Sequence, residues 1–555
     1  MTKKSIPLLL TFACINTLVV GQTLSPAGQA EHPQHDAPIT RPLNNEISEA
    51  GNNYGFDMAP ETTPRVVAAV IKSIKHKGPK GPLKPTWASL KANYQVPEWF
   101  KVAKFGICMH WGLYSVPAFG NEWYEKHMYG DPKTMKWHAE HFGPQDQFGY
   151  KDFIPLFTAE RFDPNALAEL IKKSGARFFS PACQHHDGFA LWDSKVAPFN
   201  SKLMGPHRDI IGELAKAVRE RGLKFGITNH QIENFQFINP PAELAEKMRS
   251  ESADLYDPKW ANFYNYADRS GEACRKFLVN WYERNVELID KYRPDILYFD
   301  NGVDQRYLDP LKLQVAAYYY NRAKEWGKQV TIDTKKAAYA PSGVNTGTIG
   351  SVVDFESNVP PGIRSGVWNA DTPIGSTWGY TEGMHSADAA SLVAKLIDIA
   401  SKNGTMMLNI SPKGDGSIPQ QQVDALLGIG KWLDINGEAI YGTHNWIKFG
   451  EGDLKKGRKI SFTVKGDVLY AIIQGPWNNG QLTVSALPES MGRISSVSLL
   501  GDSEKLTYNQ DSNGLNVILP AKQPCDIAWS LKIKGLKMNP NTTTKDGNPI
   551  EYQNQ

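Results

Sequence analysis

The sequence predicts an α/β protein with a (β/α)8-like barrel followed by a C-terminal antiparallel β-sandwich. The main observation is an alternation of short apolar runs and amphipathic segments from about residue 90 to 443, which is typical of a parallel sheet covered by helices. After Gly442 the chain changes to short β-rich segments separated by Gly, Asn and Asp, as expected for a sandwich. No Gly-rich phosphate loop follows the first apolar run, which argues against a nucleotide-binding fold.

The barrel strands are predicted from apolar runs bounded by turn residues, a pattern typical of buried parallel strands. Seven such runs are clear, and the eighth strand is not evident. The seven predicted strands are residues 104–110, 177–183, 224–228, 296–299, 329–332, 351–355 and 405–410.

The helices between these strands are predicted from apolar side chains spaced three and four residues apart. The segment 165–175 is the clearest, because Pro164 precedes it and Gly175 ends it. The other predicted helices are residues 209–221, 276–291, 311–326 and 388–402.

The whole chain divides into five predicted parts. In order, they are a signal peptide (1–30), a flexible N-terminal extension (31–88), the barrel (89–443), the β-sandwich domain (444–537) and a polar tail (538–555). A short helix is expected at 66–74 inside the extension. The predicted sandwich strands are residues 459–464, 468–473, 481–485, 494–499, 515–519 and 526–533.

The N-terminus has the features of a secretory signal. Lys3 and Lys4 precede a largely apolar run at 6–20, and small residues nearby offer cleavage sites. We therefore expect an exported protein, periplasmic or extracellular. The segment Thr11–Cys14 is a weaker match to a lipoprotein signal, because Phe12 is bulky where a small residue is preferred.

Composition excludes several classes of protein. The formal net charge of +3 gives no reason to expect a nucleic-acid partner, and no later run is apolar enough to predict a membrane span. The five cysteines form no CxxC pair, so a zinc site of that kind has no support. The 15 Trp, 22 Tyr and 23 Phe suit either a large core or stacking against sugar rings.

Polar residues follow the predicted strands at the point where each strand ends. In an α/β barrel, the carboxyl ends of the strands carry the chemistry, so these side chains are candidates for an active site. Those that follow strands one, two, three, four and six are His110, His185, His186, His230, Asp300, Asp354 and Glu356.

Two kinds of chemistry fit this set: metal-assisted hydrolysis, and glycoside cleavage by paired carboxylates. The metal interpretation lacks a tight signature such as HExxH. Aromatic residues interleaved with the histidines favour a sugar, because a ring face can stack on a pyranose. These aromatic residues are Trp111, Trp123, Tyr124, Trp192, Tyr298 and Trp378.

Five motifs in the same order resemble glycoside hydrolase family 29, the α-L-fucosidases. They are Lys104–Pro117 followed by Glu122–Tyr124, then His185–Ser194, Pro294–Gly302, Thr377–Tyr380 and Ser401–Gly416. The resemblance covers the barrel, and the family's second domain is a C-terminal β-sandwich. It implies an exo-acting retaining α-L-fucosidase that needs no metal or other cofactor, with a fucosylated oligosaccharide or polysaccharide as its substrate.

The resemblance also implies roles for individual residues. Asp300 matches the family's nucleophile, which attacks the anomeric carbon to form a glycosyl-enzyme. Glu356 is our prediction for the acid/base, although the position that aligns with the glutamate of many members is Val359. The residues expected to bind the sugar are His110, Glu122, Trp123, His185, His186, His230, Tyr298 and Trp378.

The chain departs from the family at two places. Family members commonly have Asn-Asp-Arg where this chain has Ile332-Asp-Thr-Lys335, and Trp-Glu-Thr where it has Trp368-Asn-Ala370. Lys335 is interpreted as a solvated lysine, with contact to an anionic group such as sulfate as the alternative. These departures keep two further functions open: an exo-α-glycosidase for a galactoside or a sulfated sugar, and a non-catalytic carbohydrate-binding protein.

Overall fold

The computed structural model describes residues 63–76, 78–335, 338–340, 348–364, 366–477 and 480–536. The predicted signal peptide and the polar tail lie outside these residues. Within the predicted N-terminal extension, Pro64–Ser73 form helix α1, in agreement with the helix expected at 66–74. Its buried Val67 and Val70 pack against the long helices α10 (Gly271–Tyr292) and α11 (Asp309–Glu325).

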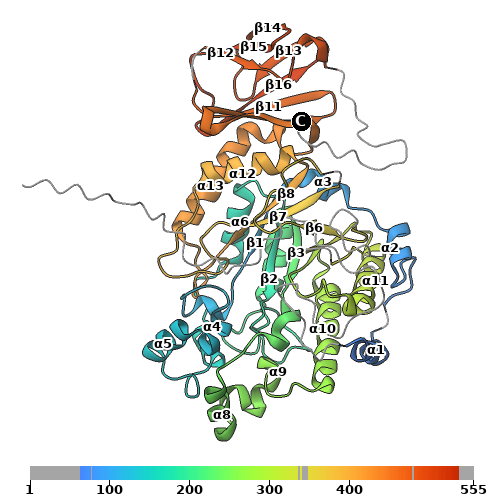
Figure 1. Ribbon diagram of the computed structural model, residues 1–555, viewed down its shortest axis with the longest axis vertical. Helices are drawn as coiled ribbons and strands as arrows, with labels where there is room; N and C mark the ends of the chain where they lie inside the picture. Colours follow the sequence, from blue (N-terminus) through green and yellow to red (C-terminus); the bar gives the residue numbers. More distant parts are fainter. Residues whose placement is uncertain are drawn as a thin grey trace, which may run out of the picture.

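Eight parallel strands close into a barrel at the centre of the molecule (Figure 1). Each strand pairs with the next one in the sequence, and β8 pairs with β1. The predicted barrel is therefore confirmed. The strands are β1 (Phe105–Met109), β2 (Phe178–Gln184), β3 (Lys224–Asn229), β4 (Ile296–Phe299), β5 (Thr331–Lys335), β6 (Val352–Asp354), β7 (Trp368–Pro373) and β8 (Gly404–Ile410).

Strand β7 is the eighth strand that the sequence did not make evident. It has no apolar run, because Asn369, Asp371 and Thr372 alternate with its few apolar residues and it ends at Pro373. All three polar residues are nevertheless buried, and Asn369 and Asp371 contact Asp354 and Lys335 inside the barrel. Strand β5 also differs from expectation, since it begins two residues later than predicted and ends at Lys335.

The barrel helices begin at residues that can cap them. Asp163 accepts hydrogen bonds from the first turn of α6 (Pro164–Lys173), and Asp209, Ser270 and Asp388 do the same for α7 (Ile210–Glu220), α10 and α12 (Ala389–Ser401). A further helix, α13 (Gln420–Asn436), follows β8 and packs against α12. Each of these helices buries an apolar face against the strands or its neighbours.

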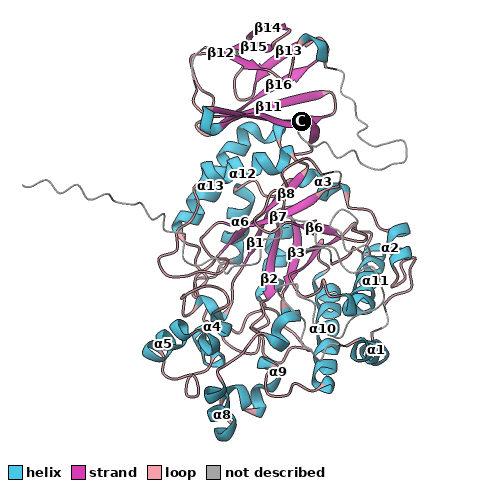
Figure 2. Cartoon of the chain, in the orientation of Figure 1, coloured by secondary structure: helices cyan, strands magenta, loops and turns pink. Residues whose placement is uncertain are grey.

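Smaller helices surround the barrel. They are α2 (Trp87–Asn93), α3 (Glu98–Ala103), α4 (Tyr124–Gly130), α5 (Pro132–His141), α8 (Ala242–Glu251) and α9 (Ala261–Tyr264). In Figure 2 the helices α4, α5, α8 and α9 lie at one end of the barrel and the C-terminal sheets at the other. Among the described residues, no helix is long and apolar enough to cross a membrane.

The C-terminal part forms two antiparallel sheets, which confirms the predicted class of this region. One sheet has the order β13-β16-β11-β10-β9 and the other β12-β15-β14. Both contribute to a single apolar core, and α12 and α13 lie between this domain and the barrel (Figure 1). The strands are β9 (His444–Asp453), β10 (Arg458–Lys465), β11 (Val468–Gln474), β12 (Gln481–Val484), β13 (Ser496–Leu499), β14 (Thr507–Asp511), β15 (Gly514–Ile518) and β16 (Ala528–Lys534).

Candidate active site

The predicted site residues gather at the carboxyl ends of the barrel strands. His110 follows β1, His185 and His186 follow β2, His230 follows β3 and Asp300 follows β4. Parallel strands in a closed barrel bring these ends to one rim, so residues far apart in the sequence meet there. The four histidines and Asp300 are all buried, with exposed fractions between 1% and 6%.

Asp300 lies at the centre of a network of charged groups. Its Oδ2 is 2.9 Å from His230 Nδ1 and 3.5 Å from His186 Nε2, and its Oδ1 is 2.7 Å from Lys335 Nζ. Burial alone would raise the pKa of Asp300, but the charge of Lys335 and the contact with His230 hold it well below its ordinary value. Asp300 is therefore an ionised carboxylate.

Lys335 occupies a position that the sequence analysis did not foresee. It is 7% exposed, and its Nζ lies 2.7 Å from Asp300 Oδ1, 3.1 Å from Glu356 Oε2 and 3.8 Å from Asp371 Oδ2. Burial lowers its pKa, but these carboxylates outweigh burial and hold the pKa well above its ordinary value. The interpretation of Lys335 as a solvated lysine is wrong, because β5 extends far enough to carry it into the site.

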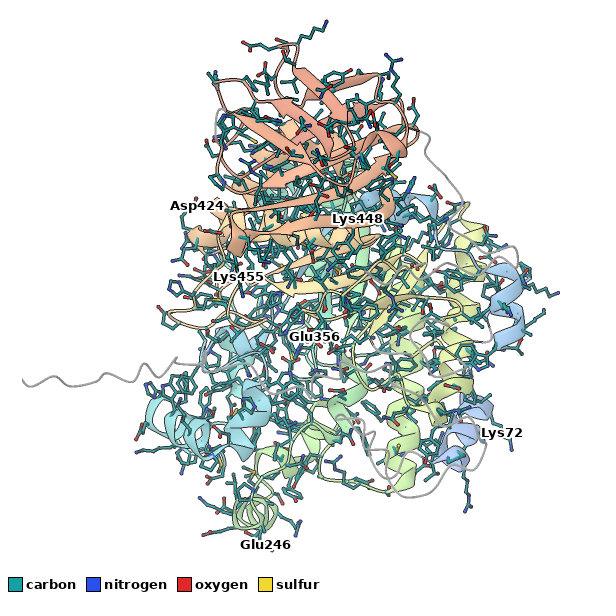
Figure 3. All side chains as sticks on the ribbon, turned by 45° about the horizontal axis from the view of Figure 1, so that its top comes forward. Lys72, Glu246, Glu356, Asp424, Lys448 and Lys455 are labelled. Atoms are coloured by element: carbon teal, nitrogen blue, oxygen red, sulfur yellow. The ribbon has the colours of Figure 1, made fainter. Side chains whose placement is uncertain are left out.

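Glu356 lies in the loop after β6 and is more exposed than Asp300. Its side chain is 20% exposed, compared with 7% for Asp300. In Figure 3 it falls over the middle of the molecule, away from Lys72 and Glu246 at the edges. The ammonium group of Lys335 contacts both Glu356 and Asp300. The 2.7 Å and 3.1 Å contacts of Nζ add to 5.8 Å, which is the greatest possible separation of the two carboxylate oxygens.

The histidines are held in fixed orientations by their neighbours. His110 Nδ1 lies 2.7 Å from Asn409 Oδ1, and Asn409 Nδ2 donates to the carbonyl oxygen of Trp378. His186 Nδ1 lies 2.9 Å from the carbonyl oxygen of His230. Burial lowers the pKa of His110 and of His186 to about 3, and that of His185 well below its ordinary value. These rings are therefore neutral.

Glu122 and two tryptophans lie beside the histidines. The backbone N–H groups of Trp378 and Gly379 each donate to Glu122 Oε2 at 3.1 Å. Burial raises the pKa of Glu122, and these hydrogen bonds oppose the rise. The Trp378 ring centre is 5.2 Å from that of His110, and the Trp123 ring centre is 6.0 Å from that of His186. Both tryptophans are half-buried and line the same region.

Tyr298 lies deeper in the barrel than its predicted role suggests. It is 1% exposed, and its hydroxyl donates to Asp354 Oδ2 at 3.2 Å and to Asp371 Oδ2 at 3.1 Å. Burial, together with the nearby charge of Asp371, raises the pKa of Asp354 well above its ordinary value. The Tyr298 ring still lies 6.5 Å from that of His230, so it forms part of the wall behind Asp300.

Three residues near the site were not predicted from sequence: Asn409, Glu233 and Asp371. Asn409 holds His110, Glu233 Oε2 lies 3.6 Å from His186 Nε2, and Asp371 lies beside Lys335. Asn409 is inside a predicted strand, where an inward-facing polar residue was a signal that could have been used. The other two belong to a short helix after β3 and to the unrecognised strand β7.

Gly302 shapes the loop that follows Asp300. Its φ of 88° lies in the left-handed region, which side chains other than glycine rarely adopt. A Cβ at this position would lie 2.8 Å from Ile232 Cγ2 and 3.1 Å from Glu233 Cγ. The glycine therefore allows the loop after β4 to pack closely against the segment after β3, which carries His230.

Comparisons with known proteins agree with this geometry. The α-L-fucosidase family profile matches residues 70–438, and the profile of the α-L-fucosidase C-terminal domain matches residues 455–534. The chain belongs to the α-L-fucosidase family. The eight barrel strands lie within the first matched segment, and strands β10 to β16 lie within the second.

Relatives in this family come from animals and bacteria. The chain is 30% identical to the tissue α-L-fucosidase of Homo sapiens over 84% of this chain and 95% of that protein. It is 32% identical to the α-L-fucosidase of Branchiostoma floridae over 81% of this chain and 96% of that protein. The structure of Thermotoga maritima α-fucosidase in complex with fucose matches with a TM-score of 0.66 and 31% identity, covering 81% of this chain and 99% of that one.

Proposed function

We propose that this α-L-fucosidase removes terminal α-L-fucosyl groups by double displacement, with Asp300 as the nucleophile and Glu356 as the acid/base. Family membership gives the activity, and the arrangement of the two carboxylates supports the roles. Asp300 is ionised, buried and held by His230 and Lys335, as a nucleophile of this kind must be. Glu356 is more exposed, which suits a group that exchanges protons with water and with the departing alcohol.

The observation that carries this proposal is the cation shared by Asp300 and Glu356. The contacts of Lys335 limit the separation of the two carboxylate oxygens to 5.8 Å. Retaining glycosidases have carboxyl groups about 5–5.5 Å apart, whereas inverting enzymes need about 6.5–9.5 Å to admit a water molecule. The limit, which applies to the two oxygens that contact Lys335, is compatible with the spacing of a retaining enzyme.

The reaction has two steps. In the first, an Asp300 oxygen bonds to the anomeric carbon, the bond from that carbon to the departing oxygen breaks, and Glu356 gives its proton to that oxygen. In the second, Glu356 takes a proton from water as the water oxygen attacks the anomeric carbon. The bond to Asp300 breaks, and fucose leaves with its original anomeric configuration.

The neutral histidines suit recognition of sugar hydroxyl groups. A neutral imidazole has one donor and one acceptor nitrogen, so it can match a hydroxyl in either role. His185 Nδ1 and His230 Nε2 are buried without a hydrogen-bond partner among the described residues, which supports a polar ligand beside them. The faces of Trp123 and Trp378 offer apolar contact for the sugar ring and its methyl group.

The substrate class beyond fucose is also part of the proposal. A fucosylated oligosaccharide or polysaccharide fits an exo-acting enzyme whose nucleophile is buried, because only the terminal sugar needs to reach Asp300. Export to the periplasm or the extracellular space rests on the basic and apolar residues at the N-terminus. Fractionation of cells expressing the full chain tests the location, and retention of activity in the cytoplasm would contradict it.

The test is release of 4-nitrophenol from its α-L-fucoside and its α-D-galactoside by the wild type, Asp300→Ala and Glu356→Ala. We expect the wild type to cleave the fucoside in strong preference to the galactoside, and Asp300→Ala to lose several orders of magnitude in kcat. Azide should restore turnover to Glu356→Ala by attacking the glycosyl-enzyme directly. Preference for the galactoside, or fucose binding without any turnover, would replace the proposal with one of the two alternative functions.

A further inference from the structure

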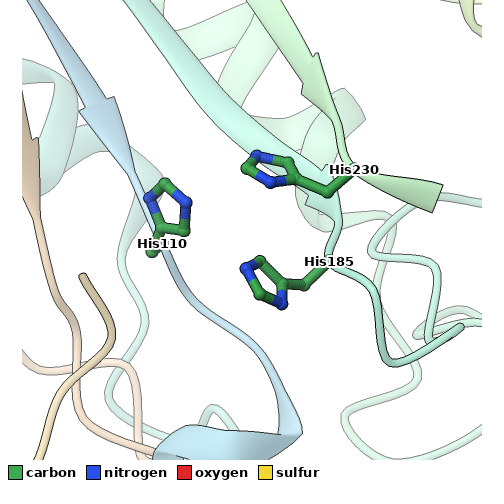
Figure 4. Close-up of side chains that lie close together, drawn as sticks. All are labelled: His110, His185 and His230. Carbon is green, nitrogen blue, oxygen red and sulfur yellow. The ribbon is translucent and has the colours of Figure 1, made fainter. Parts of the chain in front are cut away.

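We propose that His110, His185 and His230 form a binding site for a divalent transition-metal ion such as Zn²⁺ within the sugar pocket, so that the metal is a reversible competitive inhibitor. The metal here is an inhibitor and takes no part in the hydrolysis. That it competes with the sugar rests on the proposed function, whereas binding of the metal itself does not. Figure 4 shows the three rings facing one another from the ends of different strands.

The spacing of the three rings matches a tetrahedral ion. With zinc-to-nitrogen bonds of about 2.0–2.1 Å, the ring centres of three imidazoles around one ion lie about 5.2 Å apart. The measured separations are 5.6 Å for His110 and His185, 5.0 Å for His110 and His230, and 4.9 Å for His185 and His230. One ring nitrogen from each residue lies within 4.8 Å of the others. Shifts of the rings by about 1 Å would therefore bring all three nitrogens to bonding distance from one ion.

The hydrogen bonds leave ligating nitrogens available. Asn409 donates through its Nδ2 to Trp378, so its Oδ1 is an acceptor and His110 Nδ1 carries the proton. The ionised Asp300 likewise accepts from His230 Nδ1. The lone pair of the His110 ring is therefore on Nε2, and in His230 the ring nitrogen that does not contact Asp300 is Nε2. A carboxylate or amide oxygen behind a histidine is the usual support of a metal ligand, because it fixes the tautomer and the ring orientation.

A second observation points to a ligand at this place. His230 Nε2 and His185 Nδ1 are buried and have no hydrogen-bond partner within the described part of the chain. The two residues are 2% and 4% exposed. Two unpartnered ring nitrogens at one place are candidate metal ligands, because an imidazole nitrogen binds a metal through its lone pair.

A neighbouring group of possible ligands, His186, His230 and Asp300, is less suitable. In this group Asp300 already accepts from His230 Nδ1 and contacts Lys335 Nζ at 2.7 Å. A metal ion there would displace a hydrogen bond and approach a buried ammonium group of like charge. The three-histidine group contains no carboxylate that is already paired with Lys335, and three imidazoles leave a fourth position for water.

The experiment adds Co²⁺ to the purified full chain and records the visible spectrum, because tetrahedral Co²⁺ absorbs far more strongly than octahedral Co²⁺. We expect tetrahedral bands that saturate near one equivalent and disappear when Zn²⁺ is added. His185→Gln and His110→Gln should each weaken Co²⁺ binding by at least about tenfold, the lower limit for loss of even a supporting residue. His141→Gln, which changes an exposed histidine on α5, is the matched control and should bind as the wild type does.

Competition with L-fucose separates this inference from the proposed function. If the bands appear, depend on His185 and His110, and are removed by excess fucose, both are supported, and Zn²⁺ should raise KM without changing kcat. If the bands depend on these histidines but fucose has no effect, the metal site stands and the assignment of the sugar pocket fails. Binding that is octahedral, absent, or equal in wild type and both pocket variants overturns the metal site while leaving the fucosidase reaction intact.

Discussion

Lys335 offers the sharpest test of the electrostatics around the nucleophile. At 2.7 Å, two unit charges attract by about 6 kcal/mol with an effective dielectric constant of about 20, before the cost of burying them is subtracted. Removing one partner from a buried pair typically costs about 3–5 kcal/mol. If about 3 kcal/mol of this acts on the ionised form of Asp300, loss of Lys335 raises the pKa of Asp300 by about two units, at 1.36 kcal/mol per unit.

The variant Lys335→Met keeps most of the side-chain volume and removes the charge. In the wild type, Asp300 stays ionised down to a pH well below its ordinary pKa, so activity should not be lost there through its protonation. In Lys335→Met we expect an acid limb set by Asp300 to appear in kcat/KM for 4-nitrophenyl α-L-fucoside, about two pH units above the pH at which Asp300 takes up its proton in the wild type. Lys335→Arg retains the charge that family members commonly carry here, and should move it little.

Lys402→Met is the matched control for this experiment. Lys402 is also 7% exposed and pairs with Asp398 at 3.0 Å, but it precedes β8 and so lies at the opposite end of the barrel. It should lose stability without moving the acid limb. The reasoning is refuted if Lys335→Met keeps the wild-type pH profile, or if Lys402→Met shifts the profile as much as Lys335→Met does.

Three further predictions concern the neutral histidines, the support of His110 and the turn after the nucleophile. The pKa values of His110, His185 and His186 are lower in the folded state than in the unfolded state, so unfolding takes up protons as the pH falls below about 6.5. The free energy of unfolding should then fall by up to about 4 kcal/mol per pH unit. When this free energy is measured by urea titration at several pH values, its slope against pH should be smaller in His185→Gln, by the contribution of one proton. Asn409→Leu removes the acceptor that orients His110 and should lower kcat/KM by about 10–100-fold, whereas an unchanged value would show that His110 needs no such support. Gly302→Ala should cost about 1–3 kcal/mol because of its φ of 88°, and an unchanged Tm would contradict the close packing described for this loop.

The sequence was sufficient for most of the fold because the relevant signals are local. Seven of the eight barrel strands are apolar runs between turn residues, and the main helices begin at capping residues such as Asp163 and Asp209. Strand β7 was missed because its inward-facing residues are polar. Asn369 and Asp371 are stabilised by contacts with groups on other strands, among them Asp354 and Lys335, and a reading of the segment alone cannot reveal such partners.

The candidate site was predictable in part for the same reason. His110, His185, His230 and Asp300 each follow a recognisable strand, so barrel geometry alone predicts that they meet. Lys335 was misjudged because its environment depends on carboxylates from β4, the loop after β6 and β7. Without these partners a lysine at a strand end is expected to be in water. Its burial becomes intelligible only when three acidic groups surround it.

The central claim is that Asp300 becomes covalently bonded to the sugar. The most direct measurement is mass spectrometry of the protein after reaction with 2-deoxy-2-fluoro-L-fucosyl fluoride, in which fluorine slows the second step so that the glycosyl-enzyme accumulates. We predict one added fluorofucosyl group, located by peptide fragmentation on Asp300 and absent from Asp300→Ala. A label on a different carboxylate, such as Glu233 or Glu356, or full inactivation without any covalent label, would contradict the mechanism.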